Sequence, residues 1–195
     1  RGNATLVNAK EVLLTGTAMS AGVAWAPCKL DLSTSFDLEF DLNLGVTVND
    51  SGCGMAFVLH NDPRGFSAIG GIGGGNGYGS SWGTAIAPSV AVEVDPSATT
   101  SDGDPAWEHV CVIENGVMTQ SAGCAMGPVD PTVGSVKDGQ FHRLRARWDA
   151  TSHVLRVDMD GDNLLSYTKN MVNDIFGNVS QVYVGLTAGT GGGTN

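Results

Sequence analysis

The feature that most constrains this chain is a two-residue alternation of apolar and charged side chains. In residues 36–42 every second residue is apolar, and the residues between are acidic. Successive side chains of a β-strand point to opposite faces of its sheet, so this segment has one buried and one wet face. The same alternation in 143–148 and 155–159 predicts a β-hairpin, with an arginine facing Asp158 as a weak surface pair.

Short apolar runs and abundant glycine complete the expected architecture. Residues 55–59, 90–94 and 182–186 are apolar runs typical of central strands, whereas only 171–176 favours a helical turn. The 28 glycines favour turns over helices. We therefore expect an all-β fold, an antiparallel β-sandwich or jelly roll, in one domain over residues 1–195 of a longer chain.

Charge and hydropathy exclude two classes of partner. Acidic residues outnumber basic ones 20 to 10, which gives a net charge of −10. Nucleic-acid binding needs clustered Lys and Arg against phosphate, so it is not expected. No apolar run approaches the roughly 20 residues of a membrane-spanning helix, so no transmembrane segment is expected.

The four cysteines lack the C-x-x-C spacing of a zinc site, and their even number fits two disulfides formed in an oxidising compartment. Four cysteines allow three pairings. Cys111 with Cys124 flanks an expected hairpin and is the favoured pair, which leaves Cys28 with Cys53; four buried free thiols are the alternative. Three Asn-x-Ser/Thr triplets are compatible with secretion.

An acidic stretch carries the clearest chemistry. Glu93 and Asp95 are two residues apart on an expected strand, so both carboxylates point to one face. Asp104 and His109 follow across a loop. Carboxylates with an imidazole suit a divalent transition metal, and the oxygen-rich loop beside Asp95 suits Ca²⁺. A solvated acidic loop is the alternative interpretation.

Residues 70–79 contain seven glycines and no GK[ST], which argues against phosphate binding and favours a place where a ligand approaches bare backbone.

Trp82 and Trp107 lie in loops that flank the acidic stretch and are candidates for sugar stacking. Trp148 sits in an inward register and is expected in the core. The remaining histidines have no metal spacing and are expected at the surface or in turns, namely His60, His142 and His153.

Five segments together resemble the L-type (legume-type) lectins, closest to their bacterial and other non-plant relatives, which share a concanavalin A-like sandwich. The segments are 35–40, 54–63, 73–79 together with 90–95, 138–142 and 182–191. The first and last strands of the family have no counterpart here. We therefore expect neighbouring domains or subunits to cover open sheet edges.

The resemblance implies two cation sites whose spacing matches the family at every step. A site for Mn²⁺ or another divalent transition metal would use Glu93, Asp95, Asp104 and His109. A Ca²⁺ site would use Asp95, Ser97, Thr99 and Asp104. Thr99 stands where the family usually has Asn, and a Thr hydroxyl is a shorter and weaker ligand.

The resemblance also implies a sugar site that has lost two side chains. Its positions here are Cys53, Gly74, Gly75, Thr99, Ala188 and Gly189, the last two in an expected terminal loop, 188–193. Cys53 replaces the family's Asp and Thr99 its Asn. Because hydrogen bonds to charged groups contribute about 1.5–3 kcal/mol each, the monosaccharide site is expected to be degenerate.

The resemblance thus predicts a secreted or cell-surface, calcium-dependent carbohydrate-binding domain whose partners are glycans or glycoproteins. The alternative is a structural or adhesive extracellular domain that keeps the fold without binding sugar. A glycoside hydrolase is less favoured, because similar glucanases carry Glu-x-Asp-x-x-Glu and Ala98 replaces the second Glu. No enzymatic activity is expected.

Overall fold

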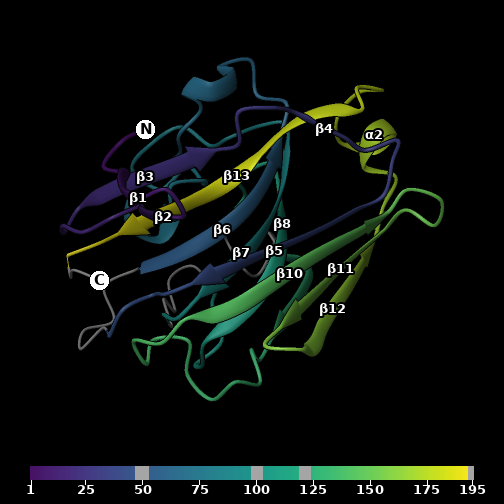
Figure 1. Cartoon of the computed structure of the whole chain (residues 1–195). Coiled ribbons are helices and arrows are strands. Elements are labelled where there is room, and N and C mark those ends of the chain that lie inside the picture. The colour runs from purple at the N-terminus through teal and green to yellow at the C-terminus, as the bar shows by residue number, and fades with distance from the viewer. Residues whose placement is uncertain (47–52, 98–102, 119–123, 193–195) are drawn as a thin grey trace.

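A computed structural model describes residues 1–46, 53–97, 103–118 and 124–192. In this part of the chain, antiparallel strands form two large sheets and a separate hairpin (Figure 1). The larger sheet has seven strands. Six of them lie side by side in the order β3 (Ser20–Trp25), β13 (Gln181–Thr190), β6 (Cys53–His60), β7 (Ser89–Asp95), β8 (His109–Glu114), β9 (Cys124–Val129). The seventh, β4 (Leu30–Asp31), pairs with the start of β13. The predicted all-β antiparallel sandwich is confirmed.

The smaller sheet has four strands, in the order β12 (Asp162–Thr168), β11 (Val154–Met159), β10 (His142–Asp149), β5 (Phe36–Leu42). The predicted hairpin is β10 with β11. Across β10 and β5, Leu144 pairs with Phe40 and Arg145 with Glu39, so apolar and charged pairs alternate. The apolar residues turn toward the larger sheet, and the charged ones turn to solvent.

The main core lies between the two sheets. It includes Phe57, Val92, Leu144 and Trp148, contributed by both sheets. The Trp148 indole N–H donates to the Leu32 carbonyl at 2.9 Å, so this buried polar group is satisfied. The prediction that Trp148 belongs to the core is confirmed.

The other face of the seven-stranded sheet is also covered. Ala56 and Val58 of β6 and Ala91 of β7 meet Tyr78 and Ile86, which come from the connection 61–88. This connection contains two 3-10 turns, η1 (Gly65–Ser67) and η2 (Gly73–Gly75). The central strands are therefore buried on both faces, which explains their nearly continuous apolar runs.

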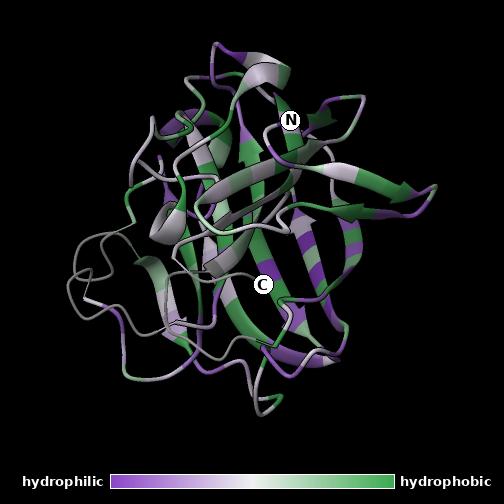
Figure 2. Cartoon of the chain, turned by 90° about the vertical axis from the view of Figure 1, so that its left-hand side faces the viewer, coloured by the Kyte–Doolittle hydropathy of each residue, from purple (hydrophilic) through white to green (hydrophobic). Residues whose placement is uncertain are grey.

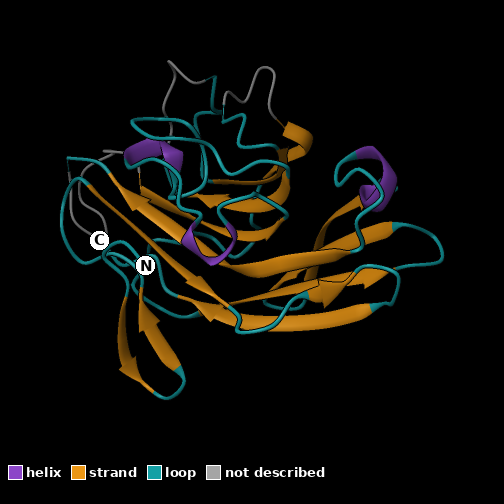
Figure 3. Ribbon diagram, turned by 90° about the horizontal axis from the view of Figure 1, so that it is seen from above, coloured by secondary structure: helices purple, strands orange, loops and turns teal. Residues whose placement is uncertain are grey.

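A separate hairpin, β1 (Thr5–Asn8) with β2 (Glu11–Leu13), stands away from the sheets (Figure 3) and carries apolar residues at its surface (Figure 2). The one helical turn that the sequence favours is present as α2 (Met171–Asp174). No helix among the described residues is long and apolar enough to cross a membrane.

Two histidines expected at the surface or in turns are buried, which corrects the sequence interpretation. His60 is fully buried between the rings of Trp25 and Tyr183. His142 is buried between Asp138 and Asp160, whose carboxylate oxygens lie 3.2 and 2.8 Å from its two ring nitrogens. His153 is half-buried beside Trp148. The rings around His60 come from distant strands, and Asp160 reaches His142 across a hairpin, so sequence spacing gave no signal of this burial.

The arginine pair expected at Asp158 is present, but Asp158 is buried, so it is not the surface pair that the sequence predicts. Arg145 lies opposite Asp158 in the strand register, but Arg147 makes the ion pair, at 2.5 Å. Asp158 is buried, because β12 covers it and Asn163 donates to its other oxygen at 3.0 Å.

The structure separates the predicted pair Cys28 and Cys53. Cys28 precedes Leu30, which pairs with Val182 near the start of β13, whereas Cys53 pairs with Thr190 at its end. Eight residues at about 3.3 Å each place these two pairing points roughly 26 Å apart. A disulfide needs Cα atoms within about 7 Å, so this pairing is wrong.

Cys111 and Cys124 lie together on β8 and β9, as the sequence predicts. Cys124 is opposite Ile113 in the register, and Cys111 is buried. A hydrogen bond between the two thiols, together with burial, raises the pKa of Cys111. Their disulfide stays a prediction.

Candidate functional site

Three ligand-bearing side chains converge at one end of β7 and β8. Glu93 and Asp95 alternate with the valines of β7 and face the side covered by the connection 61–88. Antiparallel pairing sets His109 of β8 directly opposite Asp95. The candidate ligand atoms of Glu93, Asp95 and His109 lie within 4.8 Å of one another, and all three residues are buried. We call this group the cation cluster.

Neutral donors orient the two carboxylates of the cation cluster. Glu93 Oε1 accepts a hydrogen bond from Asn76 Nδ2 at 2.7 Å, and Glu93 Oε2 accepts one from Cys111 Sγ at 3.4 Å. Asp95 Oδ1 accepts from the backbone N–H of Ser97 at 2.7 Å. These donors leave the negative charges in place. Like charges this close in a buried site destabilise each other unless a cation joins them.

His109 has the protonation state that a metal requires. Burial lowers the pKa of His109. The backbone of Trp107 raises this pKa, but by less than burial lowers it. The imidazole is therefore neutral at physiological pH, the form that binds metals. Both of its ring nitrogens are buried without a hydrogen-bond partner among the described residues. Two carboxylates and this imidazole are a fitting donor set for a divalent transition metal.

The remaining predicted metal ligands are placed differently. Ser97 is buried next to the cation cluster, through its bond to Asp95. Asp104 is half-buried and lies outside the group of three. Thr99 lies outside the described residues.

The glycine-rich segment lies directly on the seven-stranded sheet. Thr187 Oγ1 of β13 donates to the Asn76 carbonyl at 2.8 Å, just after η2. A Cβ built on Gly189 would lie 2.8 Å from the Gly73 carbonyl oxygen, so only glycine permits this approach. The loop thus sits over β13 and beside the cation cluster.

Not all residues predicted to contact sugar are at a surface. Gly74 is half-buried, whereas Gly75 is buried. Ala188 and Gly189 are buried strand residues: β13 continues to Thr190 because it pairs with both β3 and β6. The expectation of a terminal loop that begins at residue 188 is therefore wrong. The backbone of Cys53 opens β6; its side chain lies outside the described residues.

An open cavity of about 320 Å³ lies beside the cation cluster, near Trp107. Trp107 is 44% exposed and its ring centroid lies 6.3 Å from that of His109. Lys137 fixes the cavity wall, since its Nζ donates to the Pro96 carbonyl at 2.9 Å. Asp130 and Gly134 also line the cavity. Trp82, the other candidate for stacking, is 84% exposed and lines neither this cavity nor the cluster.

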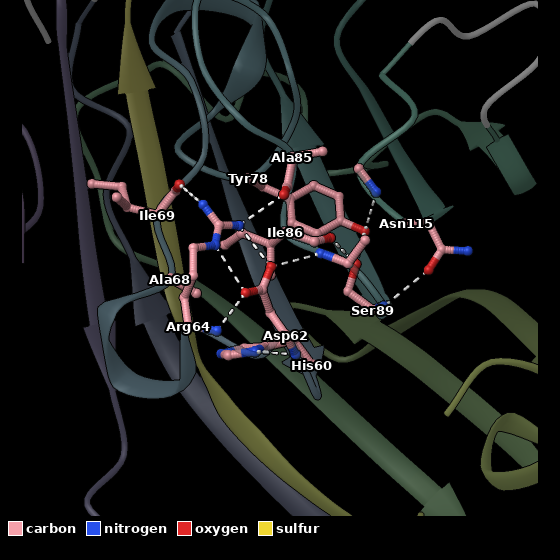
Figure 4. A network of polar contacts seen from close by, with 12 residues as sticks. His60, Asp62, Arg64, Ala68, Ile69, Tyr78, Ala85, Ile86, Ser89 and Asn115 are labelled. Atoms are coloured by element: carbon pink, nitrogen blue, oxygen red, sulfur yellow. Dashed lines mark hydrogen bonds and ion pairs between the residues drawn. The ribbon is translucent and has the colours of Figure 1, made fainter. Parts of the chain in front are cut away.

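A second polar network lies at the opposite end of β7 (Figure 4). Asp62 and Arg64 form a two-point ion pair, with Nη2–Oδ2 at 2.6 Å and Nε–Oδ1 at 2.8 Å. Arg64 also donates to the carbonyls of Ile69 and Ala85, and the Ala87 N–H donates to Asp62. We call these five residues the Asp62 clamp, because they join the two ends of the connection 61–88.

Burial alone would raise the pKa of Asp62, but the hydrogen bonds from Arg64 and Ala87 and the charge of Arg64 lower it to about 2. Sequence reasoning identified neither the clamp nor Asn76. Asn76 had one available signal, a lone Asn in a run of glycines, where a left-handed conformation is expected.

A family model, the legume lectin beta-barrel domain, matches residues 1–195. Among solved structures, lectin I-B4 from Griffonia simplicifolia in its metal-free form is 25% identical, with 98% of this chain and 84% of that chain covered and a TM-score of 0.73. The lectin from Bauhinia forficata in complex with GalNAc is 20% identical, with coverage of 98% and 85% and a TM-score of 0.75.

The carbohydrate recognition domain of Emp46p, in a metal-free form, is 14% identical, with coverage of 100% and 82% and a TM-score of 0.66. At 20% and 14% identity, the Bauhinia and Emp46p matches show a shared fold alone.

Proposed function

Since the chain belongs to the legume-type (L-type) lectin domain family, we propose that it binds glycans beside a cation held by the cation cluster. Family membership favours binding over catalysis. The observation that carries the proposal is the position of Glu93, Asp95 and His109, buried together next to the glycine-rich loop. A bare backbone loop lets a sugar approach closely, and a cation beside it would fix the loop's position.

The cation cluster would hold the transition metal, Mn²⁺ or a similar ion, through its two carboxylates and its imidazole. Ca²⁺ would use Asp95 and Ser97, joined by Thr99 and Asp104. When bound, the cations supply positive charge that neutralises the buried carboxylates. The chain itself supplies the neutral histidine and the donors that orient Glu93.

The proposed ligand is an extended glycan rather than a monosaccharide. Cys53 and Thr99 replace the two family side chains that grip a single sugar, so the affinity for a single sugar is expected to be weak. The cavity beside Trp107 supplies an exposed indole with Asp130 and Lys137 near it. An indole face stacks on a pyranose ring, and the charged groups suit its hydroxyls. This favours Trp107 over Trp82 as the second contact.

A glycan array with oligosaccharides and their component monosaccharides tests this function. We expect oligosaccharide binding in Mn²⁺ and Ca²⁺ that disappears with EDTA and in Glu93→Gln. Glu39→Gln, an exposed acid on the opposite sheet, is the matched control and should bind normally. Binding that survives both EDTA and Glu93→Gln would contradict the cation dependence.

The second candidate is a structural or adhesive extracellular domain that keeps the fold and binds no sugar. The burial of Ala188 and Gly189 and the replacement at Cys53 favour it. A cation-loaded protein that binds no glycan on a broad array would select this candidate.

The proposed extracellular setting is supported by the three Asn-x-Ser/Thr triplets and by the adjacent Cys111 and Cys124.

A further inference from the structure

We propose that Asn76 is a positioning residue that couples the cation cluster to the glycine-rich loop. Its side chain orients Glu93, and its backbone fixes the loop on β13. Cation binding and order in the loop would therefore depend on each other. The inference rests on the cation site of the proposed function, but it concerns a residue outside the metal-ligand set.

The side chain of Asn76 reaches Glu93 through a narrow passage over β6. Asn76 is fully buried, and its Nδ2 donates to Glu93 Oε1 at 2.7 Å. A Cβ built on Gly54 would lie 2.6 Å from that Nδ2 and 2.7 Å from Oδ1. Real Cβ atoms do not come so close, so glycine at position 54 makes room for the amide.

The backbone of the same residue fixes the loop. Asn76 ends η2 in the left-handed conformation, with φ 49° and ψ 30°, and its N–H donates to the Gly73 carbonyl at 2.9 Å. Its own carbonyl accepts from Thr187 Oγ1 of β13 at 2.8 Å. One residue therefore contacts η2, β6, β7 and β13, and a shift of Glu93 must be transmitted to the loop.

Asparagine suits this position for two reasons. It adopts the left-handed conformation more readily than other non-glycine residues. Its amide is a neutral donor, so it orients Glu93 without cancelling the charge that attracts a cation, as Lys or Arg would. Partners that orient a metal ligand in this way commonly change metal affinity by 10- to 100-fold.

An unpartnered atom points to a ligand at the same place. Asn76 Oδ1 is buried and has no hydrogen-bond partner among the described residues, as is also true of both ring nitrogens of His109. An unpartnered buried acceptor destabilises a protein. Its presence next to the cation cluster is explained if a hydrated cation completes the site and its water donates to Oδ1.

The experiment compares Asn76→Gly with Asn115→Gly. Both asparagines have positive φ and a side-chain hydrogen bond, but Asn115 accepts from the N–H of Ser89, at the end of β7 opposite to the cluster. Glycine retains the left-handed backbone, so each variant removes only a side chain. We expect Asn76→Gly to bind Mn²⁺ roughly tenfold or more weakly in calorimetry, and Asn115→Gly to bind it as the parent does.

Hydrogen exchange of the parent protein supplies a second measurement that needs no variant. Mn²⁺ should slow exchange of the amides of residues 73–77 and leave those of residues 64–68 unchanged. In Asn76→Gly, saturating Mn²⁺ should no longer slow exchange in the loop. The coupling is reciprocal: if bound Mn²⁺ stabilises the ordered loop, the ordered loop strengthens Mn²⁺ binding by the same free energy.

Equal Mn²⁺ affinity of Asn76→Gly and parent would overturn the proposal. A loop whose exchange ignores Mn²⁺ while the cation binds would also overturn it, as would a parent that binds no Mn²⁺. Intact coupling without any glycan binding would instead refute the proposed function and support this inference.

Discussion

The Asp62 clamp and the cation cluster lie on the same face of the same sheet, at opposite ends of β7. They differ in the partners of their buried carboxylates. In the clamp, the carboxylate of Asp62 pairs with the guanidinium of Arg64, and two backbone carbonyls accept further hydrogen bonds from that guanidinium (Figure 4). In the cluster, the ligand atoms of two buried carboxylates and a neutral imidazole lie within 4.8 Å of one another, and Asn76 and the Ser97 N–H donate to the two carboxylates as neutral groups. A carboxylate paired with a guanidinium stabilises the fold by itself, whereas two neighbouring carboxylates with an imidazole are a donor set that suits a cation.

Unpartnered atoms alone do not identify a site. His60 Nε2 and Arg147 Nε are also buried without partners among the described residues. His60 is a neutral ring that stacks on Tyr183 and meets Trp25 edge-on, and Nη2 of Arg147 makes the ion pair with Asp158. What distinguishes the cluster is that unpartnered donor atoms and two carboxylates occur together.

The largest effect is expected from Arg64→Met, which would leave the buried carboxylate of Asp62 without its counterion. Losing one partner of a buried pair costs about 3–5 kcal/mol in the free energy of unfolding. Chemical denaturation should show this loss equally with Mn²⁺ and with EDTA. A loss that depends on the cation would mean that the clamp and the cluster are not separate.

Asp95→Asn should slightly raise the free energy of unfolding of the cation-free protein, the opposite of the effect of Arg64→Met, because it removes one of two like charges. The parent should gain about 4 kcal/mol at a thousandfold excess of Mn²⁺ over Kd, and the variant should lose that gain. Melting curves with Mn²⁺ and with EDTA measure both effects, and Asp37→Asn on the four-stranded sheet is the control. A parent whose melting ignores EDTA would remove the contrast between the two regions.

The clamp region should also be sensitive to acid through His60, whose Nδ1 accepts from the Asp62 N–H at 3.2 Å. Burial lowers the pKa of His60 from 6.5 to about 4, more than the charge of Asp62 raises it. Between these values the unfolded chain binds a proton that the folded chain does not. Stability attributable to His60 is therefore complete above pH 6.5 and falls as the pH drops toward 4.

The shift of 6.5 to about 4 corresponds to roughly 3 kcal/mol. Denaturation in EDTA at pH 7.5, 5.5 and 4.5, compared between parent and His60→Phe, isolates this contribution. The variant should show a flatter pH dependence in this range. Parallel curves for the two proteins would show that His60 is not the responsible group.

The smallest of these effects is expected for Tyr78→Phe, near the middle of the loop-covered face. The Tyr78 hydroxyl accepts from the Gly116 N–H at 2.9 Å and lies 2.8 Å from Ser89 Oγ, which donates to the Ile86 carbonyl. Its removal leaves the buried Gly116 N–H unsatisfied and should cost about 1–2 kcal/mol. Mn²⁺ affinity in calorimetry should stay unchanged; a weaker affinity would show that the two regions are connected through Tyr78.

The sequence by itself determined the sandwich and part of the candidate site. The alternation in 36–42 and 143–148 fixed which side chains face inward, because a strand has a period of two whatever its neighbours. The same rule put Glu93 and Asp95 on one face. These are properties of one segment at a time, so they can be derived without the rest of the chain.

The tertiary structure decided what depends on segments far apart in the chain. Strand register brought His109 opposite Asp95, and loop packing brought Asn76 to Glu93 across Gly54. Pairing with both β3 and β6 extended β13 through Ala188 and Gly189, and aromatic rings from distant strands buried His60. Each of these outcomes depends on which of many possible partners a residue meets in space, and local periodicity carries no information about that choice.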